Sequence, residues 1–348
     1  MIDCAFDRSR ASSMKTRLLG LLSFAGLMAA PTSGQAQEVV AGNSGSIQVL
    51  LNGGVVNPTT VAVRDNVAFL VEGQLSLVGQ VANPFKVVTV ALDGTGLLAD
   101  TVPLPGDDFF PEGIALDAAT NDLFVGSLQT GAVVKIPANT FTAQDFAAPA
   151  PAVLQRGAVG LEVDNTSGVV WACDSNLDVA GATLTGINLA DATVRVTHQF
   201  PGANDVCNDI TFDAAGNLFV TESATGQIFT IDAANLLTQN SLELLVATPG
   251  IAAAPGGVGA NGIAFAGGAL FVANTSAGTI VRFDPAAADV AGSEQLVNVT
   301  ENNAANTLLS GPDGILALSD TELLIVENGL FGNAQNRLVK LTLDPLQP

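Results

Sequence analysis

The sequence has very few of the residues on which many catalytic and metal sites depend. Its 348 residues include one histidine, one tryptophan, three cysteines and no tyrosine, and aromatic residues make up 5%. With only His198 available as an imidazole, the chain is a poor match for zinc or copper, which prefer histidine or cysteine ligands. Alanine, valine, leucine and 36 glycines dominate instead, a composition that suits short, tightly packed strands joined by many turns.

Basic residues are also scarce. Lysine and arginine number 12 against 33 aspartates and glutamates, which gives a formal net charge of −21. Such a chain repels phosphate backbones and anionic lipid, so we expect no nucleic-acid partner. Acidity of this kind more often reflects solubility or a saline habitat than a function, and it is compatible with divalent cations.

Only one apolar run is of a length that suggests targeting. Lys15 and Arg17 precede the apolar residues 18–30, and small residues follow up to an expected cut near Gln37. This order predicts a leader and secretory signal peptide over residues 1–36, although a buried helix is the alternative. We therefore expect an exported protein, periplasmic or extracellular, with no membrane span once the signal is removed.

A phrase of three short apolar runs recurs along the rest of the chain. Its clearest copy spans residues 207–232, where a turn at 213–216 and a second turn closed by Gly226 separate the runs. Runs of this kind predict three antiparallel strands. Other copies begin at Thr59, Pro111, Val159, Ala260 and Pro312.

Aligning the copies places six residues at one repeat position just before the first strand, here called the anchor position. They are Thr59, Glu112, Gly160, Asn208, Asn261 and Asp313, with successive differences of 53, 48, 48, 53 and 52 residues. A period near fifty with several short strands is typical of a β-propeller blade. The sequence thus predicts one all-β domain over residues 38–348, a six-bladed β-propeller of four-stranded antiparallel blades.

The ends of the chain are expected to close the ring. The last repeat, from Pro312, shows only three strands, and residues 46–51 can supply the fourth. A sheet that contains both chain ends removes the exposed edges of an open ring. The other repeats have weaker fourth strands, predicted at residues 97–102, 193–200, 242–246 and 295–299.

The cysteines leave two alternatives open. Cys4 lies in the leader, whereas Cys173 ends a second strand and Cys207 opens the first strand of the next repeat. In an exported chain these two can form a disulfide, or they can be two buried free thiols. A cysteine nucleophile is disfavoured because His198 falls in an outer strand, where we expect a surface role.

The anchor position carries the candidate chemistry. Glu112, Asn208, Asn261 and Asp313 bring two carboxylates and two amide carbonyls toward one axis. These hard oxygen donors suit Ca²⁺ or another divalent cation, and without one the carboxylates would repel and raise each other's pKa. The alternative is that such residues satisfy local backbone groups, but four at one repeat position favour a shared site.

The phrases PEGIALD, NDITFDAAGNLFVTES, NGIAF and PDGIL resemble those of the senescence marker protein/gluconolactonase/LRE-like six-bladed propellers. Diisopropyl fluorophosphatase and paraoxonase are more distant relatives of that group. There a central Ca²⁺ is held by Glu from one blade and by Asn, Asn and Asp from the third, fourth and fifth blades counted from it. The order Glu112, Asn208, Asn261, Asp313 fits that pattern.

The chain also departs from the pattern. Its glutamate lies in the second repeat, Gly160 brings no side chain, and Asp209 stands where other copies have glycine. The metal-site histidines of paraoxonase-like enzymes have no counterpart here.

The resemblance implies a Ca²⁺-dependent hydrolase of lactones or related esters. Asp313 would then be the catalytic residue, which activates water, binds the metal, or does both. The alternative is a non-catalytic scaffold that resembles NHL-type repeats and binds a peptide, glycan or protein partner. An open, lined channel favours the enzyme and an apolar plug favours the scaffold, while the single His198 weakens a third possibility, a virginiamycin-type lyase. Substrate contacts would come from the channel-end loops, where polar residues follow the second strands (Asp174, Ser175, Asn176, Glu222, Asn274 and Glu327). Such residues usually serve turns, so none is given a catalytic role.

Overall fold

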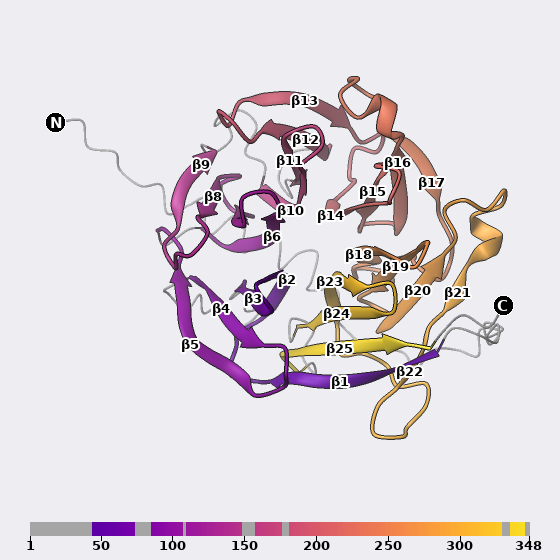
Figure 1. Cartoon of the computed structure of the whole chain (residues 1–348). Helices are drawn as coiled ribbons and strands as arrows, with labels where there is room; N and C mark the ends of the chain where they lie inside the picture. Colours follow the sequence, from indigo (N-terminus) through magenta and orange to yellow (C-terminus); the bar gives the residue numbers. More distant parts are fainter. Residues whose placement is uncertain are drawn as a thin grey trace.

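The computed structural model describes residues 44–73, 85–106, 109–147, 157–175, 181–328 and 335–344. Their strands form six sheets, which Figure 1 shows as blades in a ring viewed along its axis. The fold is the six-bladed β-propeller predicted from the repeat. The predicted leader and signal peptide, with Cys4, lies outside the described residues.

Blades 1 to 5 are four-stranded antiparallel sheets in simple chain order, with the first strand nearest the axis and the last at the rim (Figure 1). Blade 1 contains β2 (Pro58–Arg64), β3 (Val67–Glu72), β4 (Lys86–Ala91) and β5 (Gly96–Pro103). Blade 2 contains β6 (Pro111–Asp117), β7 (Asp122–Ser127), β8 (Val133–Ile136) and β9 (Gln144–Ala147). Blade 3 contains β10 (Gly157–Asp164), β11 (Val169–Ser175), β12 (Thr183–Asn188) and β13 (Val194–Gln199).

The next two blades follow the same plan. Blade 4 contains β14 (Cys207–Phe212), β15 (Leu218–Glu222), β16 (Gln227–Ile231) and β17 (Glu243–Val246). Blade 5 contains β18 (Ala260–Ala266), β19 (Ala269–Asn274), β20 (Thr279–Phe283) and the short β21 (Gln295–Leu296). Helical structure in the described residues is limited to the 3₁₀ turns η1 (Ala233–Asn235) and η2 (Ala291–Ser293), and neither could cross a bilayer.

Blade 6 joins the two ends of the chain. It contains β23 (Pro312–Ser319), β24 (Glu322–Glu327), β25 (Arg337–Leu343) and the N-terminal β1 (Ser44–Asn52), which pairs antiparallel with β25. The predicted ring closure is therefore confirmed.

The fourth strand predicted at residues 295–299 is divided between two blades. Residues 295 and 296 form β21, whereas β22 (Asn298–Thr300) pairs in parallel with β1 of blade 6. This pairing covers the outer edge of β1, which would otherwise present free backbone groups.

Six apolar clusters fill the interfaces between neighbouring blades. On β15, Leu218 and Val220 pack toward blade 3 while Phe219 packs toward blade 5. Successive strand residues point to opposite faces, and here both faces are covered by apolar neighbours. This explains why the second strands appear in the sequence as continuous apolar runs.

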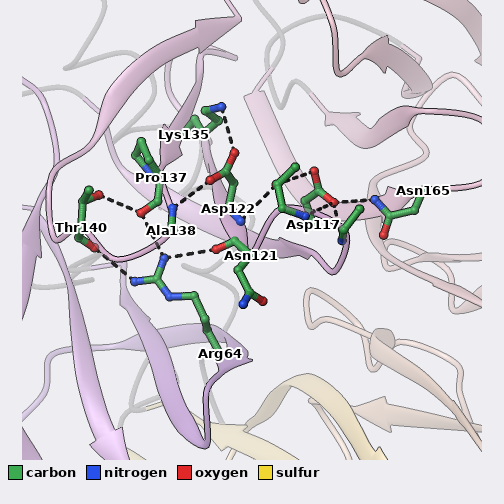
Figure 2. Close-up of polar contacts among 11 residues, drawn as sticks. Arg64, Asp117, Asn121, Asp122, Lys135, Pro137, Ala138, Thr140 and Asn165 are labelled. Atoms are coloured by element: carbon green, nitrogen blue, oxygen red, sulfur yellow. Dashed lines mark hydrogen bonds and ion pairs between the residues drawn. The ribbon is translucent and has the colours of Figure 1, made fainter.

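Polar contacts tie blades together at the end of the ring where the inner strands finish (Figure 2). Arg64 closes β2 and reaches blade 2, where its guanidinium donates to the carbonyl oxygens of Asn121, Pro137 and Thr140. Asp117 closes β6 and accepts a 2.6 Å hydrogen bond from Asn165 of blade 3. These charges are used in structural contacts at the end opposite the anchor positions.

Candidate metal centre

Strand pairing corrects one residue of the repeat alignment. Ile114 lies opposite Val125 and Ile210 opposite Val220, and in blade 3 the equivalent pair is Leu161 with Ala172. The anchor residue, two positions earlier, is therefore Val159, and the prediction that Gly160 holds this position was wrong. The anchor position of VGLEVD holds the apolar Val159, whereas Gly160 and Asp164 match Gly113 and Asp117 of PEGIALD, so the sequence and the strand pairing agree on the corrected register.

The glycines that follow the anchor residues are needed because the inner strands approach each other closely. A Cβ on Gly160 would lie 2.0 Å from the carbonyl oxygen of Asn208 in the next blade, and one on Gly113 would lie 2.3 Å from that of Val159. Real Cβ atoms do not come so near backbone, so a side chain there would push the strands apart. The inner strands therefore lie very close together directly beside the anchor residues.

In blade 4, Asp209 stands in place of this glycine, and its side chain makes hydrogen bonds where the neighbouring inner strands lie close together. Its Oδ2 accepts a 3.1 Å hydrogen bond from the backbone N–H of Ile263 in blade 5, and its Oδ1 accepts one from Ile210. In blade 1, Thr60 donates to the carbonyl of Glu112 at 2.7 Å. Both exceptions join adjacent blades by a side-chain hydrogen bond.

The structure brings three of the four predicted ligands into one interacting group. Asn261 and Asp313 are 6% and 5% exposed, and the Asn261 amide lies close enough to the Asp313 carboxylate to lower its pKa against the larger effect of burial. Burial, with a further contribution from the charge of Asp313, raises the pKa of Glu112 well above its ordinary value. Asn208 occupies the same register position in blade 4 and is half-buried.

Burial is the main cause of the pKa shifts at this group. It raises the pKa of Asp313 to about 8, with the charge of Asp209 adding to the effect. The rise expected from converging carboxylates is therefore present, but loss of hydration contributes more than repulsion does.

Two oxygen atoms of this group are buried without a hydrogen-bond partner: Glu112 Oε2 and Asn261 Oδ1. A buried acceptor that is left unpaired costs about 1–3 kcal/mol, so native proteins rarely keep one without a ligand. Both belong to oxygen donors of the kind that Ca²⁺ takes in flexible geometry. The residues present thus fit a hard divalent cation. The described residues contain no cluster of three or more His, Cys, Asp or Glu arranged for a metal, so the fit depends on two carboxylates supplemented by amide oxygens.

A cavity of about 170 Å³ extends along the axis beside the anchor residues, lined by residues of all six inner strands. Its lining begins at the residue after the anchor position and does not include Glu112, Asn208, Asn261 or Asp313. Two acidic residues line it, Asp209 and Glu162, and burial raises their pKa values to about 7 and about 8. Sequence reasoning missed Glu162 because its repeat position holds alanine or threonine in blades 2, 4 and 5, and only the strand pairing shows that it faces the channel.

At the end of the second strand of several blades, a side-chain hydroxyl makes a hydrogen bond to the first strand of the next blade, which carries a predicted ligand. Each donates to the carbonyl oxygen of the residue just before an anchor residue. The pairs are Ser175 to Cys207 (2.8 Å), Ser223 to Ala260 (2.6 Å) and Thr275 to Pro312 (2.7 Å). In blade 6 Asn328 takes this place and donates directly to Asp313 Oδ2. Sequence reasoning assigned no role to this position, although Ser, Thr or Asn recurs there.

The other polar residues after second strands serve the turns, as expected. Glu222 accepts hydrogen bonds from the backbone of Val206 at 3.0 Å and of the following turn, and Asn274 donates to the carbonyls of Gly250 and Ala252. Glu327 forms a 2.6 Å ion pair with Arg337. Asn176 lies outside the described residues.

A disulfide connects Cys173 of blade 3 to Cys207 of blade 4, with 5.2 Å between the Cα atoms. Of the two alternatives left by the sequence, a disulfide or two buried free thiols, the structure has the disulfide. Cys207 directly precedes Asn208, so the covalent link anchors the start of a ligand-bearing strand.

His198 lies on the outer strand β13 as predicted, but the expected surface role is wrong because the side chain is fully buried. Its Nδ1 accepts a hydrogen bond from the backbone of Ser241 and its Nε2 donates to the carbonyl of Leu236 at 3.0 Å. The segment after β16 covers it, and burial lowers its pKa. The chain's one imidazole is thus a structural group of blades 3 and 4, far from the anchor residues.

Comparison with known proteins places the fold among solved propellers. No protein-family model and no curated protein sequence matches the chain. A gluconolactonase from Xanthomonas campestris has a TM-score of 0.59 at 14% identity over 87% of this chain and 91% of its own. A calcium-binding regucalcin from Agrobacterium tumefaciens has 0.60 at 12% over 87% and 93%.

A virginiamycin B lyase from Staphylococcus aureus, in a catalytically inactive form with histidine replaced by alanine, has a TM-score of 0.56 at 14% identity over 86% of this chain and 99% of its own. Together these structures establish that the chain has the six-bladed propeller fold of gluconolactonase and regucalcin, the group that the sequence phrases resemble. At such identities the likeness defines the fold alone.

Proposed function

We propose that the chain is a hydrolase of lactones or related esters that depends on Ca²⁺ or a similar divalent cation bound at the anchor residues. Glu112, Asn208, Asn261 and Asp313 would hold the ion. The observation that carries the proposal is the pair of buried, unpaired oxygens on Glu112 and Asn261, beside a carboxylate whose pKa is raised.

A bound calcium ion would polarise the carbonyl of the substrate and stabilise the oxyanion that develops on it. The protein's own part is to fix the donors and to move a proton. Asn328 holds Oδ2 of Asp313 by a hydrogen bond, which orients the carboxylate. Asp313, ionised beside the cation, would take the proton of the attacking water.

Two observations favour hydrolysis over the scaffold and the lyase. The channel contains a cavity lined partly by carboxylates, a feature that suits substrate binding better than an apolar scaffold core does. The lyase neighbour is inactive without a histidine, and here His198 is enclosed between an outer strand and its covering segment.

Export remains part of the proposal. The disulfide between Cys173 and Cys207 requires an oxidising compartment in most organisms. This supports the periplasmic or extracellular location that the leader suggests.

The proposal is tested with a panel of aliphatic lactones and aryl esters, assayed with calcium and after removal of metal by a chelator. The expected result is turnover of at least one lactone or ester that a chelator abolishes and that calcium restores. Asp313→Asn should abolish it too, whereas Asp117→Asn, at the opposite end of the ring, should retain it. An enzyme fully active in chelator, or an Asp313→Asn variant as active as the parent, would refute the proposal.

A further inference from the structure

The orientation of one amide in the candidate metal centre is fixed by a residue outside the predicted ligand set. Thr275 is 5% exposed and lies in the same blade as Asn261. Its Oγ1 makes two hydrogen bonds, one with Asn261 Nδ2 at 2.8 Å and one with the carbonyl oxygen of Pro312 at 2.7 Å.

The directions of these two hydrogen bonds follow from chemistry. A carbonyl oxygen can only accept, so the single hydroxyl proton of Thr275 goes to Pro312. The same hydroxyl can then only accept from Asn261, which must present its NH₂ group rather than its oxygen. The Asp313 carboxylate lies close enough to Asn261 for this amide to lower its pKa. Asn261 Oδ1 is left buried and unpaired.

Resting on the proposed cation site, we infer that Thr275 is a positioning residue that keeps Asn261 Oδ1 available to a divalent cation and holds the strand carrying Asp313. The second effect arises because Pro312, which accepts from Thr275, is bonded directly to Asp313. Without the hydroxyl the amide can turn, and its NH₂ group would then oppose a cation. Ser175 and Ser223 make the matching contact before Asn208 and Asn261, so Thr275 belongs to a repeated ring of supporting hydroxyls.

The test measures calcium affinity by titration calorimetry on the purified protein and on variants of Thr275. Thr275→Val keeps the shape of the side chain and removes the hydroxyl, and Thr275→Ala serves if the valine variant does not fold. Groups that orient metal ligands typically contribute 10–100-fold in affinity, so we expect a loss of at least tenfold. Thr275→Ser, which keeps the oxygen, should bind within about threefold of the parent on the same scale. Thr89→Val is the matched control, because Thr89 is a buried threonine that also donates to a backbone carbonyl, but far from the channel.

A second background separates orientation from general damage to the fold. Aspartate has oxygen at both ends and needs no orienting partner, so in the variant Asn261→Asp the additional change Thr275→Val should cost less affinity than it does in the parent, and the remaining loss reports the contact with Pro312. An equal loss in both backgrounds, a Thr275→Val variant that binds calcium like the parent, or a serine variant as weak as the valine variant would overturn the inference while leaving the cation site intact. A parent protein that binds no calcium would instead refute the proposed function, and the role of Thr275 with it.

Discussion

Replacing Asp313 by asparagine should make the calcium-free protein more stable while it removes calcium binding. Asp313 has an ordinary pKa of 3.8 and a pKa of about 8 in the folded chain, mainly because of burial. At pH 7 the folded chain therefore keeps a proton that the unfolded chain releases. At 1.36 kcal/mol per pH unit between 3.8 and 7, this costs about 4 kcal/mol.

Asparagine does not ionise, so this cost disappears in the variant. It still buries a polar amide with its own cost of about 1–3 kcal/mol, and we expect a net gain of about 1–3 kcal/mol. The folded state binds the extra proton between pH 4 and 8, so the stability of the calcium-free parent should fall as pH rises through that range. The Asp313→Asn variant should lack the part of this pH dependence that comes from the Asp313 carboxyl.

The assay is thermal and denaturant unfolding of both proteins, first in chelator and then with calcium. A ligand at one hundred times its dissociation constant stabilises the folded state by about 2.7 kcal/mol, so calcium should reverse the order and make the parent the more stable protein. If Asp313→Asn is less stable than the parent in chelator, then Asp313 is not a strained buried carboxylate. If both proteins gain equally from calcium, then Asp313 is not a ligand.

Three further predictions concern the frame of the site. Replacing Cys173 and Cys207 together by serine should lower the free energy of unfolding by about 4 kcal/mol, since the disulfide closes a loop of 34 residues; an unchanged denaturation midpoint would show that the thiols are not joined. Gly160→Ala should lower the free energy of unfolding by about 1–3 kcal/mol because its Cβ would meet the carbonyl of Asn208. An unchanged free energy of unfolding would contradict the corrected register. Burial lowers the pKa of His198 below its ordinary 6.5, so the unfolded chain binds the proton more readily. The contribution of His198 to the free energy of unfolding should be fully present above pH 6.5 and should decrease below it. Thermal unfolding at pH 7.5 and 5.0 should show this decrease in the parent and not in His198→Asn.

The fold could be predicted because each blade repeats one physical unit. The second strands are buried on both faces, so they appear as continuous apolar runs, and turn residues such as Asp213 and Gly216 separate them clearly. Asp213 accepts hydrogen bonds from the turn that follows it, and Gly216 has a φ of 85°, which favours glycine. Ring closure followed from counting strands in the last repeat.

The parts that could not be predicted depend on contacts between blades. Gly160 and Val159 differ by one residue, and the pairing of β10 with β11 assigns the anchor position to Val159, whose side chain packs in the apolar cluster between blades 3 and 4. The role of Thr275 is visible only when Pro312, from another blade, lies beside it. His198 was expected at the surface because the outer strand gave no sign of the segment that covers it.

The sequence predicted which residues make up the candidate site. It did not predict how deeply they are buried or which of their atoms lack a hydrogen-bond partner. Repeat position selected Glu112, Asn261 and Asp313, and the structure places them in one interacting group. The unpaired oxygens, which distinguish a binding site from a set of turn residues, could only be seen once neighbouring side chains were in place. Glu162 likewise could be recognised as a residue that lines the cavity only in the folded structure.

Calcium titration calorimetry on the purified parent, beside Glu112→Gln and Asp313→Ala, is the most direct test of the cation site. The account predicts one calcium ion per chain, with affinity reduced at least tenfold in each variant, because a lost carboxylate removes both a ligand and a balancing charge. A parent that takes up no calcium or other divalent cation, or two variants with unchanged affinity, would contradict it.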